Sequence, residues 1–289
     1  MTGQETKKIF VVGRGENGKT MTTQTIVGEN SKVVYTSGTI NVISSADDKV
    51  DKVEVADGTG VGEPLEDLTI DIGDIIKSVD DVMVKQFINT LTAIVLVLKY
   101  GVRFTMQEKK SLHIVKDIFG QDVMKRRGVV VITYGDNFYK ENDKTFQEWC
   151  REQTGDFRSL MEECNYRCVL FDNRDGSKRE SQVKEFMATV AQIDATIPYK
   201  YTPDKNSREK LINEYKKLEP VKAEERHNVE KPKDNCNGFL SCIRSLLCYI
   251  SGCFCRLWDC CKSCNWWNSC RKSESEAPKQ GDSTPKETD

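Results

Sequence analysis

Short apolar runs alternate with segments of helical periodicity along the first 200 residues of the chain. Five runs suit buried strands, namely residues 9–12, 53–56, 93–98, 129–132 and 168–171. The helical patterns cover residues 19–27, 66–90, 106–118, 142–153 and 178–194. Because the strand runs show no polar alternation and are separated by helices, they predict a parallel-dominated sheet covered on both faces. The expected fold class is α/β.

The pattern changes after residue 198. A mixed-charge stretch predicts a short solvated helix at 207–218, which ends ahead of Pro220 and is followed by a linker. The last seventeen residues are polar and contain proline, so we expect them to be disordered. The expected organisation is a folded domain over 5–205, a charged helix and linker over 206–235, a cysteine-rich segment over 236–272 and a tail over 273–289.

Composition narrows the possible classes of protein. The 289 residues are 30% charged and 38% hydrophobic, which allows one core of roughly 200 residues plus appendages. The net charge of -2 argues against a nucleic-acid partner, whose footprint is a strongly basic face. The amino terminus has no apolar run of signal-peptide length, so we expect a cytoplasmic, reducing environment.

The first strand run is followed by the spacing GxxxxGK[ST]. In such a loop, backbone N–H groups at a helix N-terminus surround phosphates, the lysine reaches the β- and γ-phosphates, and the hydroxyl ligates Mg²⁺. The strand, loop and helix context favours this interpretation over a plain glycine turn. The predicted nucleotide contacts are Gly13, Arg14, Gly15, Glu16, Asn17, Gly18, Lys19, Thr20 and Met21, and Lys19 is also assigned to catalysis. The Glu16 carboxylate should weaken polyphosphate binding.

A nucleotide switch also needs a second carboxylate beside Mg²⁺. Asp57 to Gly60 follow a strand run and fit the spacing DxxG, although such a spacing is often only a turn. A threonine between the two motifs should close over Mg²⁺ and the γ-phosphate. We prefer Thr39 to Thr36 by its distance from Asp57, so Thr20, Thr39 and Asp57 form the expected metal set, with Thr39 also catalytic.

The ends of two later strand runs suit selection of a base. Thr133 and Asp136 follow one run, and Asn173 follows the next. A carboxylate can accept hydrogen bonds from both the ring N–H and the 2-amino group of guanine, whereas adenine offers no such pair. We therefore expect Asp136 to select guanine and Asn173 to support Asp136 and the base. Taken singly, each of these residues is more commonly part of a strand-end turn.

These motifs together resemble a known family, the immunity-associated nucleotide-binding GTPases (GIMAP or IAN family). The segments GRGENGKTMTTQTIVG and VADGTG are similar to the family's GKTGSGKSATGNSILG and VVDTPG. Residues 98–110, LKYGVRFTMQEKK, followed by Ile-Phe-Gly at 118–120, are similar to the family box LGRFTEEEK and FG. The segments ITYGD and LFDNRDGSK are similar to the family's TRGD and FDN signatures. Tyr134, Glu16 and Thr59 depart from the family pattern, where a basic residue, glycine and proline are common.

The resemblance covers roughly residues 7–200 and implies a P-loop NTPase domain of the Ras and septin type over 5–205. It implies GTP or GDP with Mg²⁺ as ligands, a homodimer or oligomer formed through the nucleotide face, and a role in immunity. Val61 follows Gly60 where Ras-like enzymes carry a water-orienting glutamine, so unaided turnover should be slow. Arg103, in the family box, is the candidate arginine acting in trans; alternatively, it pairs with a helix carboxylate.

Nine of the twelve cysteines lie between residues 236 and 270. They coincide with an amphipathic, tryptophan-bearing, basic stretch, which predicts an S-acylated anchor peripheral to an intracellular membrane. A thiolate zinc site and a helix that packs on a protein remain the alternatives. Cys150, Cys164 and Cys168 are interpreted as incidental core thiols.

Three functions follow from these features. The first is a slow GTPase switch whose nucleotide state controls self-association at a membrane. The second is a nucleotide-binding scaffold with little hydrolysis, favoured by Val61 and Glu16. The third, an ATP-dependent P-loop enzyme, is disfavoured by Asp136 and Asn173.

Overall fold

The computed structural model describes residues 6–45, 52–197 and 199–228. The chain divides into two units, Met1–His227 and Asn228–Asp289, and the described residues belong almost entirely to the first. The predicted cysteine-rich segment and the polar tail lie outside the described residues.

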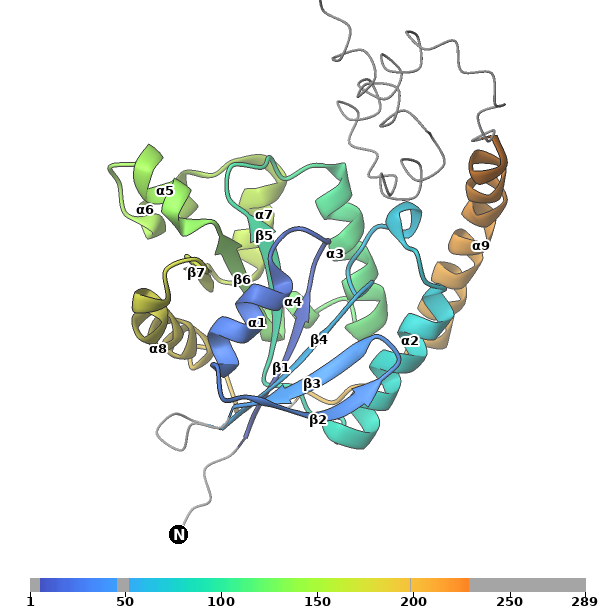
Figure 1. The fold of residues 1–289 in the computed structure, drawn as a ribbon, viewed down its shortest axis with the longest axis horizontal. Helices are drawn as coiled ribbons and strands as arrows, with labels where there is room; N and C mark the ends of the chain where they lie inside the picture. The colour runs from blue at the N-terminus through green and yellow to red at the C-terminus, as the bar shows by residue number, and fades with distance from the viewer. Residues whose placement is uncertain (1–5, 46–51, 198, 229–289) are drawn as a thin grey trace, which may run out of the picture. The chain divides into compact units, whose positions relative to one another are not determined.

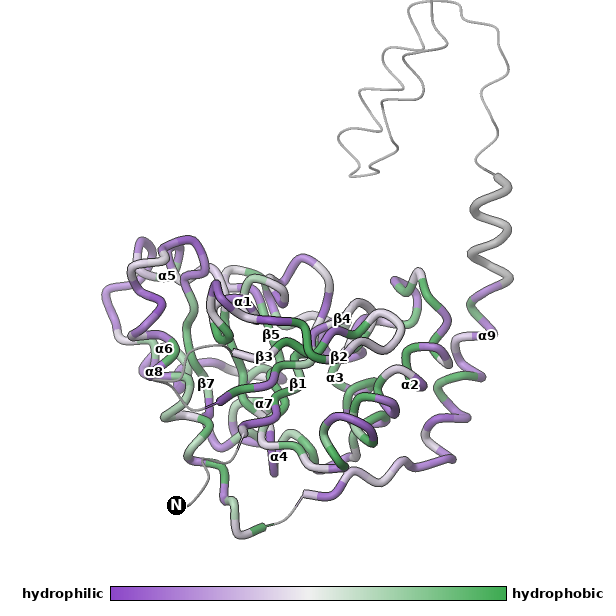
Figure 2. The backbone as a smooth tube through the Cα atoms, turned by 60° about the horizontal axis from the view of Figure 1, so that its bottom comes forward, coloured by the Kyte–Doolittle hydropathy of each residue, from purple (hydrophilic) through white to green (hydrophobic). Residues whose placement is uncertain are grey.

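A seven-stranded sheet in the order β2-β3-β4-β1-β5-β6-β7 forms the centre of the domain (Figure 1). Its parallel strands are β1 Lys7–Val12, β4 Val53–Gly58, β5 Ala93–Lys99, β6 Gly128–Thr133 and β7 Cys168–Leu170. In Figure 2 the strands in the middle of the sheet are largely green, which matches their apolar sequences. The predicted α/β fold with a parallel-dominated sheet is confirmed.

An antiparallel hairpin extends this sheet at one edge. It consists of β2 Lys32–Ser37 and β3 Ile40–Ser44, and β3 pairs antiparallel with β4. The strand pattern did not predict it, because β2 lies at the edge and most of its side chains are exposed. Such a strand has no uniformly apolar run to recognise.

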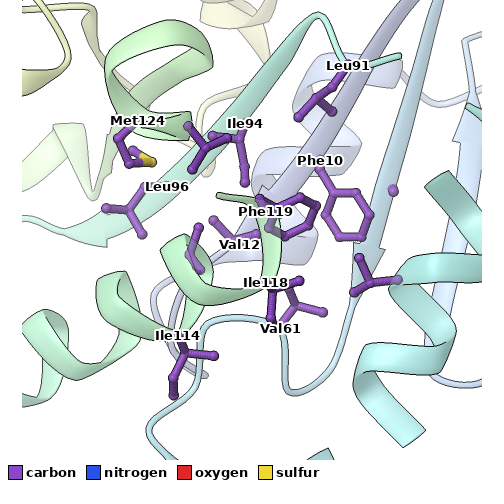
Figure 3. Close-up of a cluster of buried hydrophobic side chains, with 14 of the residues drawn as sticks. Phe10, Val12, Val61, Leu91, Ile94, Leu96, Ile114, Ile118, Phe119 and Met124 are labelled. Carbon is purple, nitrogen blue, oxygen red and sulfur yellow. The ribbon is translucent and has the colours of Figure 1, made fainter. Parts of the chain in front are cut away.

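Helices cover both faces of the sheet. On one face, α1 Lys19–Val27 and α8 Arg179–Val190 bury Ile26 and Phe186 against β1 side chains such as Ile9. The opposite face holds the larger core, part of which is drawn in Figure 3. It is covered by α2 Ile72–Asp81, α3 Met106–Phe119, α4 Val123–Arg127, α5 Gly135–Glu141, α6 Phe146–Glu152, α7 Gly155–Glu163 and α9 Lys205–Asn228. Short helical turns are η1 Leu65–Asp67, η2 Val82–Gln86 and η3 Gly176–Lys178.

The single helix predicted over 66–90 is wrong. The segment contains η1, α2 and η2, and α2 begins where the Asp71 carboxylate accepts a hydrogen bond from Gly73 N at 2.7 Å. Aspartate at this position caps a helix start, so it separates the two helical pieces. The pattern also missed α4, α5 and α7, which are short.

The helix predicted at 207–218 is longer than expected and is not solvated all round. Helix α9 runs from Lys205 to Asn228, through Pro220, and Leu211 and Tyr215 are buried in the larger core. A proline within a helix costs about 3 kcal/mol because one hydrogen bond is lost and its ring meets the preceding turn. A helix of this length that is held by core contacts tolerates that cost. The Arg208 guanidinium adds two hydrogen bonds to Asp80 of α2, at 2.6 and 2.7 Å.

The three cysteines of the described domain are buried and free, which confirms their interpretation as core thiols. Burial raises the pKa of Cys164 to about 12, so this thiol stays protonated at neutral pH. None of the helices among the described residues combines the length and hydropathy that a membrane crossing requires.

Candidate nucleotide-binding site

The loops that carry the predicted motifs meet at one edge of the sheet. Strand β1 lies between β4 and β5, with Phe10 beside Ala56 and Val12 beside Leu96. The three strands are parallel, so their carboxyl ends point to the same edge, and chain connections diverge there to either side. This is where open α/β sheets bind ligands.

The phosphate loop, residues 13–20, has a backbone that requires two of its glycines. Gly13 has φ 132°, and a Cβ there would come within 2.7 Å of Val97 O on β5. Gly18 has φ 89° and caps α1 at its first turn, where Thr22 N donates to Gly18 O at 2.9 Å. A side chain at Gly13 would clash with β5, and at Gly18 the positive φ itself favours glycine.

Hydrogen bonds hold the middle of this loop to the neighbouring strands. Asn17 Nδ2 donates to Val97 O at 3.0 Å, and the buried Thr133 hydroxyl lies 2.8 Å from Asn17 O and 3.2 Å from Leu98 O. Thr133, predicted as a base-side residue, therefore ties the loop to the ends of β5 and β6. Glu16 and Met21 are exposed, and Glu16 has a left-handed φ of 64°.

Lys19 lies inside the loop and is buried. Its Nζ donates to Gly13 O at 2.6 Å and lies 3.6 Å from Glu63 Oε1. Burial lowers the pKa of Lys19 from its ordinary value, while the charges of Glu63 and Asp57 act in the opposite direction. The ammonium is thus held by a backbone carbonyl and two carboxylates.

Two of the three ligands predicted for Mg²⁺, Thr20 and Asp57, lie close to each other and to this lysine. Burial raises the pKa of the Asp57 carboxyl, and the neighbouring Thr20 hydroxyl and Lys19 ammonium oppose that rise. A carboxylate beside a hydroxyl at the mouth of a phosphate loop is the kind of hard-oxygen donor set that Mg²⁺ takes, so these residues fit the ion. Thr39 lies in the turn between β2 and β3, and its hydroxyl donates to Thr59 O at 3.0 Å.

The segment that follows Asp57 is seated directly on the phosphate loop. Gly13 N donates to Val61 O at 3.1 Å, and a Cβ on Gly62 would lie 2.7 Å from Gly13 N. The Val61 side chain is fully buried and lies among the core side chains of Figure 3. It cannot orient a water molecule. The segment instead presents Glu63 to Lys19, a contact that no spacing rule in the sequence could have predicted.

The base end of the site is formed by the loops after β6 and β7. Asp136 Oδ2 lies 3.5 Å from Arg174 Nη1 and 3.4 Å from Lys140 Nζ. Its other oxygen, Oδ1, is buried and has no hydrogen-bond partner in the described part of the chain. A buried carboxylate oxygen without a donor is costly. The arrangement therefore suits a ligand that brings an N–H group to this oxygen.

Asn173 lies beside the phosphate loop, with its amide nitrogen 3.8 Å from the position of a Cβ on Gly18. Its Nδ2 donates to Thr22 Oγ1 at 3.3 Å and its Oδ1 accepts from the Thr25 hydroxyl at 2.8 Å. These contacts of Asn173 join the end of β7 to α1. They do not include Asp136, the group that the sequence predicted Asn173 to support.

Tyr134 adopts a left-handed conformation, with φ 61°, just before Asp136. Its ring lies between two cations: Lys99 Nζ is 4.6 Å and Arg174 Cζ is 5.6 Å from the ring centroid. Lys99 comes from the end of β5, so the structure supplies a positive charge next to the position where the family commonly has a basic residue.

The family box, residues 98–110, contains the start of α3 and contacts the phosphate loop through Glu108. Thr105 caps the helix and Glu108 completes a capping box. The Glu108 carboxylate also accepts from Arg14 Nη1 at 3.0 Å, and Arg14 Nη2 lies 3.5 Å from Asp67. Burial raises the pKa of Glu108, but the hydrogen bonds from Thr105 and Arg14 outweigh this, and the pKa is lowered from its ordinary value.

Arg103 is exposed and lines a cavity of about 380 Å³ together with Asn17, Tyr100, Trp149 and Phe157. Within the described residues it makes no ion pair. The alternative predicted from the sequence, an ion pair of Arg103 with a helix carboxylate, is thus not found there, and the nearby Glu108 of α3 is bound to Arg14.

Comparison with known proteins identifies the family of the chain. The sequence model of the AIG1 family matches residues 7–220, about three quarters of the chain. The chain belongs to the AIG1 family. The resemblance to the immunity-associated nucleotide-binding proteins is confirmed, and residues 7–220 are a G domain of this type.

Two plant relatives of the AIG1-family chain illustrate the similarity. Immune-associated nucleotide-binding protein 4 of Arabidopsis thaliana is 29% identical over 203 residues, which is 67% of this chain and 60% of that protein. Protein 3 from the same plant is 26% identical over 196 residues, which is 65% of this chain and 57% of that protein. The matched region therefore spans less than two thirds of the length of these relatives.

Solved structures show more distant likenesses. Toc33 from Arabidopsis thaliana in complex with GDP and Mg²⁺ is 14% identical, with a TM-score of 0.46 over 69% of this chain and 88% of that one. The G domain of the T. maritima FeoB iron transporter is 16% identical, with a TM-score of 0.42 over 65% of this chain and 99% of that one. Likenesses at this level add no argument about function.

Proposed function

We propose that the chain binds GTP and GDP with Mg²⁺ and selects guanine through Asp136. The observation that carries the proposal is the buried, unpartnered Asp136 Oδ1 at the same sheet edge as the phosphate loop. Guanine offers two N–H donors to one carboxylate, and adenine does not. Lys19 would hold the phosphates, and Thr20, Asp57 and Thr39 are the proposed ligands of Mg²⁺, which when bound would neutralise phosphate charge.

The direct test is the identity and affinity of the nucleotide. Full-length protein is purified and denatured, and the released nucleotide is identified. Emptied protein is then titrated with GDP and ADP in the presence of Mg²⁺. We expect released guanine nucleotide and at least a hundredfold preference for GDP, on the order of the discrimination that hydrogen-bonded sites achieve. Equal affinity for GDP and ADP would contradict the assignment.

We further propose that the chain is a slow GTPase switch whose nucleotide state controls self-association. Slow turnover is supported by the burial of Val61, which leaves no water-orienting side chain at that position. Self-association through the nucleotide face is supported by Arg103, an exposed cation that is free of ion pairs among the described residues and could act on a second copy. A scaffold with little hydrolysis is the alternative, supported by the same burial of Val61.

The role of Arg103 has its own test. Arg103→Ala should retain GTP affinity and lose the rise in turnover with protein concentration, because an arginine acting in trans contributes only in the assembled state. Arg151→Ala, which removes another exposed arginine, is the control. GTP turnover is measured per molecule over a hundredfold range of concentration. A variant that keeps the wild-type dependence would rule Arg103 out. Wild-type protein that holds GTP unhydrolysed at every concentration would favour the scaffold.

The cysteine-rich segment is proposed as a peripheral anchor on an intracellular membrane through S-acylation. The proposal rests on the nine clustered cysteines and the amphipathic, basic sequence around them. Release of the protein from membranes by hydroxylamine would support thioester anchoring. A soluble protein whose segment loses structure with a chelator would support zinc instead.

A further inference from the structure

A carboxylate of the chain itself lies inside the phosphate loop. Glu63 follows the DxxG motif in a largely buried segment, and its own side chain is only 16% exposed. Its Oε1 lies 3.6 Å from Lys19 Nζ and 3.6 Å from the position that a Cβ on Gly15 would take. One oxygen of Glu63 is therefore placed between the loop backbone and the loop lysine.

The backbone around Glu63 holds it there. Glu63 N donates to Gly60 O at 3.1 Å, and Gly13 N donates to Val61 O at 3.1 Å. Gly60 and Gly62 have φ of 89° and 82°, values that other residues rarely adopt. The buried Val61 side chain anchors the middle of the segment in the core. The backbone turn over residues 60–63 therefore fixes the position of the Glu63 carboxylate.

The position of Glu63 corresponds to the outer end of the phosphate site. The inner end is formed by Gly18 and the start of α1, where the helix N-terminus faces a ligand. Gly15 belongs to the first half of the loop, away from that helix start, and the loop lysine reaches the outer phosphates. A buried ammonium needs a counter-charge, and Glu63 supplies one to Lys19.

We propose that Glu63 is a specificity-determining residue that occupies the place of the terminal phosphate and so makes the site discriminate against triphosphates. A nucleoside diphosphate binds with the Glu63–Lys19 pair intact. A triphosphate brings negative charge to the same place, so it must expel the carboxylate and shift the 60–63 segment. This inference rests on the proposed guanine-nucleotide binding and concerns the number of phosphates that the site prefers.

The test compares two ligands on three proteins. Full-length wild type, Glu63→Gln and Glu66→Gln are titrated calorimetrically with GDP and with the non-hydrolysed analogue GMPPNP, both with Mg²⁺. Glu66→Gln is the matched control, because Glu66 lies three residues further on and pairs with Lys110 of α3, outside the phosphate loop. We expect Glu63→Gln to raise affinity for GMPPNP about tenfold and to change affinity for GDP less than threefold, since only the third phosphate meets the carboxylate. Glu66→Gln should change neither.

Each outcome bears on one proposal or both. If wild type binds GDP and Glu63→Gln leaves the ratio of the two affinities unchanged, the Glu63 inference fails and guanine-nucleotide binding stands. If wild type and Glu63→Gln bind neither ligand, both proposals fail. In Glu63→Gln the glutamine amide could still contact Lys19, and Glu63→Ala removes that contact. Glu63→Ala should show the same change in the ratio of GMPPNP affinity to GDP affinity. Melting temperatures of the unliganded proteins verify that each variant is folded.

Discussion

The two ends of the nucleotide site differ in how their charges are satisfied. At the phosphate end, the buried Lys19 ammonium is already matched by Gly13 O, Glu63 and Asp57. At the base end, one oxygen of the Asp136 carboxylate is buried and has no donor among the described residues. The charged groups of the phosphate end are thus satisfied by the chain itself, whereas one acceptor at the base end is not. Binding of a triphosphate should therefore be opposed at the phosphate end by the loss of the Lys19–Glu63 pair, whereas at the base end a guanine N–H group would supply the donor that Asp136 lacks.

The largest expected effect is at the phosphate end. Lys19→Ala removes the only ammonium inside the described loop and leaves the Glu63 and Asp57 carboxylates facing the phosphates. We expect a loss of GDP affinity on the order of a thousandfold, because one partner of a buried charge interaction is removed. Calorimetric titration measures it. In this background Glu63→Gln should improve affinity for GMPPNP more than affinity for GDP, since only the third phosphate meets the Glu63 carboxylate. A Lys19→Ala variant that retains affinity would show that the phosphates bind elsewhere.

A smaller effect with a clearer signature is expected at the base end. Asp136→Asn should weaken GDP binding by about a hundredfold, because the carboxylate that accepts two N–H groups becomes an amide. The same variant should gain affinity for xanthosine diphosphate, which offers a carbonyl where guanine has its amino group. Asp143→Asn, an exposed substitution a short distance along the chain, is the control. Equal losses for guanine and xanthine nucleotides would mean that Asp136 supports the fold and does not read the base.

The smallest effect concerns the tie between the phosphate loop and α3. Glu108→Gln should lower the free energy of unfolding by about 1–2 kcal/mol at pH 7, since it weakens charged hydrogen bonds to Thr105 and Arg14. The folded-state pKa of Glu108 lies below its ordinary value. Its contribution is therefore fully present above that ordinary value and is lost as pH falls through the lowered pKa.

Denaturant unfolding of the free protein between pH 7 and pH 3 measures this contribution. The difference between wild type and Glu108→Gln should shrink as the pH falls. A difference that stays constant with pH would assign the effect to packing and not to the carboxylate charge. Because the Glu108–Arg14 contact lies outside the base end of the site, Glu108→Gln should leave recognition of the guanine base unchanged.

Much of the fold was readable from the apolar pattern, and the exceptions have physical causes. Strands β1, β4, β5, β6 and β7 are largely buried on both faces, so most of their residues are apolar. Strand β2 lies exposed at the sheet edge and carries no such signal. The break in the predicted 66–90 helix depends on one capping carboxylate, Asp71, and the passage of α9 through Pro220 depends on the rest of a long helix. The break at Asp71 and the course of α9 both depend on particular contacts, which the spacing of apolar residues does not reveal.

The candidate site likewise contains residues that the sequence predicted and contacts that it did not. The sequence by itself determined the phosphate loop, because Gly13, Gly18 and Lys19 stand at a spacing dictated by the backbone's approach to phosphate. It also identified the family, through motifs that lie in contiguous stretches. Only the tertiary structure decided that Glu63 faces Lys19, that Arg14 and not Arg103 pairs with Glu108, and that Asn173 bonds α1. These contacts join residues far apart along the chain, so their geometry follows from packing and not from any local spacing.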